Sequence, residues 1–187
     1  MELNFRIFNK DGIIIPVNIG VGLDYWGLTD DETRRKFYNA TEKGIMWTHN
    51  NKEIVIEDEN TSVIGSPTTD FKYVITTYLG INGKYKPPHN SIIYNLDGSI
   101  HKILEVPSLK SPLALKRLEF LNEENPPLDT AKYEGALCFS GGGGFKKLDN
   151  GKIVNFIAID YDRELWETRI LDPETGEIGD LIHYGKN

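Results

Sequence analysis

The chain of 187 residues is 39% hydrophobic and 26% charged, which excludes a disordered protein and favours a single domain over residues 1–187. Its formal net charge is −7, from 21 basic and 28 acidic side chains. This balance argues against a nucleic-acid partner, because proteins bind the phosphate backbone through lysine and arginine.

The opening of the chain predicts a β-hairpin. Apolar residues recur over 3–8 and 13–19, and the Asp11-Gly12 pair between them supplies the positive φ angles of a tight turn. Pro16 has no backbone N–H to donate. We therefore expect the second strand of this hairpin at the edge of a sheet.

Two short helices are predicted farther along the chain. A glycine-punctuated loop presents Tyr25-Trp26, after which Thr29 or Asp30 can cap a helix that runs to about residue 39. The second helix covers 112–122, where leucines recur at the spacing of an amphipathic helix.

Most of the remaining apolar segments predict β-strands. They cover 45–48, 53–57, 71–79, 91–95, 99–106, 153–161, 164–171 and 177–184. Asp97-Gly98 predicts the clearest hairpin turn, and the nearly continuous apolar run 153–159 predicts a central strand covered on both faces. The expected fold class is α+β, mainly β, with antiparallel hairpins or a meander around one core and two short helices.

A turn pattern recurs three times, at 96–100, 148–153 and 171–178. In each case Leu-Asp precedes a turn glycine, and an isoleucine follows two residues after the glycine. Asp accepts backbone hydrogen bonds inside a turn, and glycine supplies the positive φ angle. The unequal spacing favours recurring hairpins over a true repeat array, with a fragment of propeller-like architecture as the alternative.

The glycine run 141–144 is the best candidate for an anion-binding loop, because two lysines follow it. A phosphate-binding P-loop requires Gly-Lys followed by Ser or Thr, whereas here Phe145 follows Gly144. The run therefore predicts a flexible loop or bulge. Close backbone packing or a partner contact is the alternative.

Catalytic and metal-binding signals are weak. Asp160 and Asp162 share one face of a predicted strand, roughly 7 Å apart, which is compatible with the paired carboxylates of glycoside hydrolysis. No His/Cys grouping typical of a zinc site occurs, and we expect no cofactor and no metal. The histidines are widely separated: His49, His89, His101 and His183.

The chain shows no export signal. Its start lacks the basic and apolar stretches of a signal peptide, and no segment is apolar over the length of a membrane span. Cys138 is the one cysteine of the sequence, which excludes an intramolecular disulfide, and it lies in an apolar run. We expect a cytoplasmic protein with no membrane partner.

Residues 153–185 carry most of the net charge, with eight acids and two bases. Such a region attracts a basic protein partner, although a merely solvated face is the alternative. Trp166 is the predicted anchor. Its predicted charge partners are Asp160, Asp162, Glu164 and Glu167. Because successive strand residues point to opposite sides, at least one of Trp166 and Glu167 is expected to be structural.

Three segments, 94–103, 111–117 and 171–178, resemble uncharacterised bacterial proteins grouped with the immunity proteins of polymorphic or contact-delivered toxins. The resemblance implies a cytoplasmic protein that binds a cognate toxin and blocks its substrate site, and it assigns no functional residue. The predicted function is therefore an immunity or inhibitor protein. The alternatives are a small hydrolase that uses Asp160 and Asp162, and a ligand-binding β module with an apolar cavity.

Overall fold

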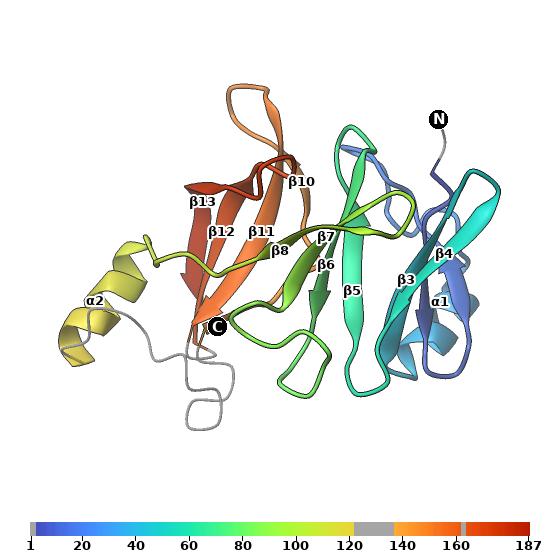
Figure 1. Ribbon diagram of the computed structural model, residues 1–187, viewed down its shortest axis with the longest axis horizontal. Coiled ribbons are helices and arrows are strands. Elements are labelled where there is room, and N and C mark those ends of the chain that lie inside the picture. The colour runs from blue at the N-terminus through green and yellow to red at the C-terminus, as the bar shows by residue number, and fades with distance from the viewer. Residues whose placement is uncertain (1–2, 122–136, 162–163) are drawn as a thin grey trace.

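The structure is a computed structural model that describes residues 3–121, 137–161 and 164–187. These residues form thirteen strands and two short helices. Figure 1 shows three sheets following one another along the longest axis, from the blue N-terminal strands through the green ones to the orange and red strands near the C-terminus. The predicted fold class, α+β and mainly β, is confirmed.

The N-terminal sheet, sheet A, has the strand order β2-β1-β3-β4. Its strands are β1 (Arg6–Asn9), β2 (Ile14–Pro16), β3 (Glu42–His49) and β4 (Lys52–Glu57). The edge position of β2 confirms the prediction from Pro16. Helix α1 (Asp31–Tyr38) connects β2 to β3, and Asp30 caps it by accepting a hydrogen bond from the backbone N–H of Thr33 at 2.9 Å.

The middle sheet, sheet B, is an antiparallel meander in the order β5-β6-β7-β8. Its strands are β5 (Val63–Pro67), β6 (Tyr73–Tyr78), β7 (Ser91–Asn95) and β8 (Ile100–Leu104). The sequence did not predict β5, because its Gly65-Ser66-Pro67 segment is typical of a turn. The predicted strand 71–79 and the hairpin of β7 and β8 are both present.

The C-terminal sheet, sheet C, has the order β10-β11-β12-β13. Its strands are β9 (Leu137–Phe139), β10 (Gly144–Lys147), β11 (Ile153–Tyr161), β12 (Leu165–Leu171) and β13 (Ile178–Lys186). Along one edge of β11, β10 pairs with its first half and β9 with its second half. Helix α2 (Pro112–Leu121) lies beyond this sheet in Figure 1. In the described ranges, neither helix is long and apolar enough to cross a membrane.

Two apolar clusters hold the three sheets together, one on each face of sheet B. Ile45 and Trp47 of sheet A meet Val74 and Ile92 of sheet B in the first cluster. The indole N–H of Trp47 also donates a hydrogen bond to the carbonyl oxygen of Leu96 at 2.8 Å. Sheet A is thus fixed to sheet B by packing and by a directional bond.

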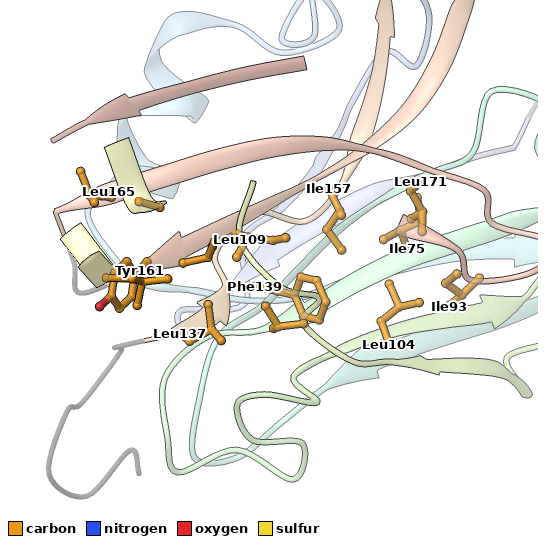
Figure 2. Packing of buried hydrophobic residues seen from close by; sticks show 14 of the residues in the cluster. Ile75, Ile93, Leu104, Leu109, Leu137, Phe139, Ile157, Tyr161, Leu165 and Leu171 are labelled. Carbon is orange, nitrogen blue, oxygen red and sulfur yellow. The ribbon is translucent and has the colours of Figure 1, made fainter. Parts of the chain in front are cut away.

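The second cluster lies between sheets B and C. In Figure 2, Ile75 and Ile93 of sheet B face Phe139 and Ile157 of sheet C. Leu118 of α2 belongs to the same cluster, so this helix covers part of the sheet. Sheet B is therefore the shared wall between two apolar interiors.

β6 is the strand that is covered on both faces, since all six of its residues are buried. The hydroxyl of Thr76 donates a hydrogen bond to the carbonyl oxygen of Ile92 at 3.1 Å, and that of Thr77 donates to the carbonyl oxygen of Gly141 at 2.6 Å. These hydrogen bonds satisfy the buried threonine hydroxyl groups. In the sequence, however, the polar residues Thr76 and Thr77 gave no indication of this burial.

The prediction that residues 153–159 are covered on both faces is wrong. In β11, Ile157 and Ile159 are fully buried, whereas Phe156 and Ala158, the residues that precede them, are only half-buried. One face of β11 is therefore partly open to solvent. A continuous apolar run does not distinguish a strand between two layers from a strand with an apolar but uncovered face.

The glycine run 141–144 lies at the junction of sheets B and C. A Cβ atom on Gly142 would lie 2.6 Å from the backbone nitrogen of Gly65, and one on Gly143 would lie 2.8 Å from a methyl carbon of Ile75. Any side chain here would push the two sheets apart. The run thus provides close backbone packing. The sequence had left this possibility open as the alternative to a flexible loop.

Asn90 reinforces the same junction. Its amide group donates hydrogen bonds to the carbonyl oxygens of Tyr78 at 2.9 Å and Phe139 at 2.8 Å. Its carbonyl oxygen accepts the backbone N–H of Phe139 at 3.0 Å. One buried side chain therefore connects sheet B with β9 of sheet C.

The recurring Leu-Asp pattern marks three hairpin turns rather than structural repeats. The turns join β7 to β8, β10 to β11 and β12 to β13. In each turn an Asp or Asn side-chain oxygen accepts a backbone N–H two residues later, at 2.9 to 3.0 Å. The turn glycines, Gly98, Gly151 and Gly176, have φ angles of +85°, +84° and +78°.

Candidate partner-binding surface

Strand alternation gives sheet C two different faces. Ile157, Ile159 and Leu171 point toward sheet B and lie in the apolar cluster. The residues between them point away from sheet B and are half-buried. We call this set the outer face of sheet C, and it consists of Cys138, Phe156, Ala158, Asp160, Trp166, Thr168 and Ile170.

Asp160 is the next-to-last residue of β11, and it lies opposite Cys138 on one neighbouring strand and Trp166 on the other. One of its carboxylate oxygens accepts a hydrogen bond from the hydroxyl of Ser140 at 2.8 Å. Burial raises the pKa of Asp160, and the Ser140 bond partly opposes that rise. Among the described residues, no lysine or arginine contributes to this pKa, so the charge has no cationic partner there.

Trp166 provides the large aromatic surface of this face. Its ring lies over Gly185 of β13, where an added Cβ atom would be 2.7 Å from the indole. The glycine therefore permits the ring to lie close to the backbone of the neighbouring strand. Trp166 is half-buried, and its backbone pairs with that of Asp160 on the neighbouring strand β11.

The other predicted partner-binding residues are placed differently. Glu164 is exposed at the start of β12 and forms an ion pair with Lys186 at 3.4 Å. Asp162 lies outside the described residues, and so does the predicted pairing of Asp160 with Asp162. Of the five predicted residues, the structure places Asp160 and Trp166 side by side on the outer face.

Glu167 is not a surface residue, which corrects its assignment to the partner-binding set. Its side chain is 1% exposed, as is that of Arg169, with which it forms an ion pair at 3.3 Å. One carboxylate oxygen also accepts the backbone N–H groups of Lys110 at 2.8 Å and Ser111 at 2.6 Å. As strand alternation required, Trp166 and Glu167 point to opposite sides, and Glu167 is the structural one.

The acids of 153–185 do not gather on a single surface. Glu164 and Asp172 flank β12 at its two ends, roughly 26 Å apart along an extended chain. Glu174 accepts a hydrogen bond from the hydroxyl of Tyr73 at 2.7 Å and so lies against sheet B. Asp160 is the one carboxylate that the described residues place within the outer face.

The outer face borders the loop before α1. Tyr25 and Leu23 of that loop line a cavity of about 250 Å³ together with Phe145 and Phe156. Leu23 is 57% exposed and Leu28 is 58% exposed. Apolar surface therefore continues from the β10 end of sheet C onto this loop.

Two further cavities are larger than this one. One, of about 640 Å³, is lined by apolar and amide side chains, including Phe5, Leu23 and Phe71. The other, of about 660 Å³, contains Asp70 and Asp97, whose pKa values are lowered by hydrogen bonds. A general acid needs a raised pKa instead. Within the described ranges, no group of His, Cys, Asp or Glu could hold a metal ion.

The sequence matches no protein-family model and no curated protein. Among solved structures, the chain is similar to a chain of the structure of Tne2 in complex with Tni2. The TM-score is 0.57 and the sequence identity 10%, and the match covers 97% of this chain and 99% of that chain. At this identity the similarity establishes a shared fold over nearly the whole length.

Proposed function

We propose that this chain is an immunity-type protein that binds a cognate toxin in the bacterial cytoplasm and blocks it through the outer face of sheet C. Two different observations support the proposal. The segments 94–103, 111–117 and 171–178 resemble immunity proteins, and the fold also occurs in a chain solved within a complex of two proteins. An inhibitor of this kind needs no catalytic group of its own.

The observation that carries the proposal is the Asp160 and Trp166 pair. A half-buried carboxylate without a cation is unfavourable in the free protein and gains its counter-charge when a cation arrives. An arginine of the partner can place its guanidinium beside Asp160 and its plane or stem against the indole of Trp166. The matching toxin surface is therefore basic at the contact and apolar around it.

The rim of the outer face fits a protein partner better than a small ligand. Phe156 and Ile170 extend the surface along the strands, and the exposed Leu23 and Leu28 continue it onto the neighbouring loop. Protein interfaces combine a central aromatic anchor with a surrounding surface that excludes water.

Partner capture followed by neutralisation tests the proposal. The immobilised chain is incubated with an extract of the native host, and each retained protein is expressed in a test bacterium with and without this chain. The variants Trp166→Ala and Asp160→Asn are compared with Asp149→Asn, an exposed aspartate in the turn between β10 and β11.

We expect a retained protein whose toxicity the wild type and Asp149→Asn relieve equally. Trp166→Ala should weaken binding by about thirtyfold or more, as for an interface anchor worth about 2 kcal/mol. Asp160→Asn should weaken it by about tenfold. The proposal fails if no retained protein is toxic, or if both outer-face variants protect as well as the wild type.

A further inference from the structure

A second carboxylate that has no partner among the described residues lies on sheet A, near aromatic side chains. Glu42 is the first residue of β3, Tyr38 is the last residue of α1, and Tyr25 and Trp26 come from the loop before that helix. The Trp26 ring packs edge-to-face against Tyr25, with centroids 4.6 Å apart, and against Tyr38, with centroids 5.6 Å apart. Three rings from two segments thus form one cluster, and the charge of Glu42 acts on its two tyrosines.

The electrostatics show that Glu42 and the two tyrosines share one environment. Burial raises the pKa of Glu42 to about 7. Burial, and next the negative charge of Glu42, raise the pKa values of Tyr25 and Tyr38. Within the described part of the chain, the Glu42 carboxylate takes part in no hydrogen bond or ion pair, and burial alone shifts its pKa.

Three cations near Glu42 in the sequence are paired with other acids, and among the described residues no cation, Arg35 included, shifts the pKa of Glu42. Lys43 pairs with Glu57 at 2.7 Å, Lys36 pairs with Glu32 at 2.7 Å, and Arg34 pairs with Asp31. The chain therefore holds a desolvated acid beside aromatic rings without supplying its counter-charge from these neighbours. Such an arrangement lowers the stability of the free protein at neutral pH.

The cluster is reachable from solvent. Tyr38 is 62% exposed, and Glu42, Tyr25 and Trp26 are half-buried. The faces of tyrosine and tryptophan rings attract cations, and the attraction grows where water is partly excluded. A carboxylate next to the rings adds a direct ionic contact.

We propose that Glu42 and the rings of Tyr25, Trp26 and Tyr38 form a binding site for a lysine or arginine side chain of a partner protein. The rings surround the cationic head and its apolar stem, and Glu42 supplies the opposite charge. The site contains no residue of the outer face of sheet C, although its Tyr25 lines the cavity that borders that face, and its test needs no toxin.

Nuclear magnetic resonance of the full chain tests the site with small probes. The protein is titrated near pH 8 with Nα-acetyl-lysine methylamide, and the Trp26 indole resonance is followed. A second titration uses the same compound with its ε-amine acetylated, which removes the charge and keeps the stem. We expect saturable binding of the charged probe and at least tenfold weaker binding of the acetylated one.

Variants then assign the binding to this cluster. Glu42→Gln should weaken binding of the charged probe at least tenfold, and Tyr38→Leu should weaken it about threefold. Glu59→Gln, which neutralises an exposed acid elsewhere, should leave binding unchanged. The proposal is overturned if no saturable shift occurs, if both probes bind alike, or if Glu42→Gln binds as the wild type does.

Discussion

The two faces of sheet C treat their carboxylates in opposite ways. On the inner face, Glu167 is 1% exposed and is satisfied by Arg169 and two backbone N–H groups. On the outer face, the half-buried Asp160 receives one hydroxyl from Ser140. Both acids belong to the same acidic stretch of the sequence, so their partners rather than their charge separate the structural Glu167 from Asp160, the proposed binding group.

The largest effect is expected for Glu167 on the inner face of sheet C. Glu167→Ala should lower the free energy of unfolding by about 3–5 kcal/mol, because it leaves the guanidinium of Arg169 buried without its counter-charge. Denaturant unfolding measures the change. Glu164→Ala is the matched control, and it should cost less than about 1 kcal/mol because its pair with Lys186 is exposed. Equal effects of the two variants would contradict the contrast.

The junction behind the inner face should be almost as sensitive. Gly142→Ala places a methyl group against the backbone of Gly65 and should destabilise the fold by about 2 kcal/mol. At Gly179 a Cβ atom would have no neighbour closer than 3.9 Å, so Gly179→Ala should change stability by less than about 0.5 kcal/mol. Thermal unfolding of both variants checks this, and a tolerant Gly142 would argue against close packing of the two sheets.

A pair of threonines sharpens the comparison between buried and open surfaces. Thr77→Val removes the hydroxyl that bonds to the carbonyl oxygen of Gly141 and should cost about 1 kcal/mol or more. Thr168→Val, the same change on the outer face, should stay within about 0.5 kcal/mol. Both changes in the free energy of unfolding follow from the denaturant midpoints, provided that the variants and the wild type unfold with the same m value. A larger cost at Thr168 would show that the outer face is structurally constrained.

Glu42 extends the contrast to sheet A through pH. Its pKa is raised from an ordinary 4.5 to about 7, so the folded state holds the proton more tightly than the unfolded state. Ionisation therefore opposes folding, and stability relative to Glu42→Gln should fall as the pH rises from about 4.5 to about 7. Near pH 8 the variant should be more stable by about 1 kcal/mol, and near pH 4 the two should match. A stability difference between the two proteins that does not change with pH would contradict the raised pKa of Glu42.

Local chemistry made much of the fold predictable. Asp97-Gly98 fixed a hairpin because the turn needs a positive φ angle, and Pro16 indicated an edge strand because it cannot donate to a ladder. The two helices were predictable from their capping residues and from the spacing of their apolar residues. β5 was not predicted because its Gly65-Ser66-Pro67 segment is typical of a turn. In the folded chain, pairing with β6 overrides that local preference.

The site was less predictable than the fold. The sequence singled out Trp166 and Asp160 as partner-binding residues, which stays a prediction, but it could not tell that Glu167 meets Arg169 and the backbone of Ser111. Ser140 was missed as a partner of Asp160 because the register of β9 on β11 decides that contact. Glu42 gave no local signal, since its environment comes from a loop and a helix end that meet it only in the folded chain.

The most direct test of the central claim is the dissociation constant between the purified chain and the toxin that it captures. The double variant Asp160→Asn with Trp166→Ala should raise this constant by about a hundredfold or more, whereas the less stable Thr77→Val should leave it unchanged. An unchanged constant for the double variant would show that the toxin binds elsewhere and would contradict the assignment of the outer face of sheet C.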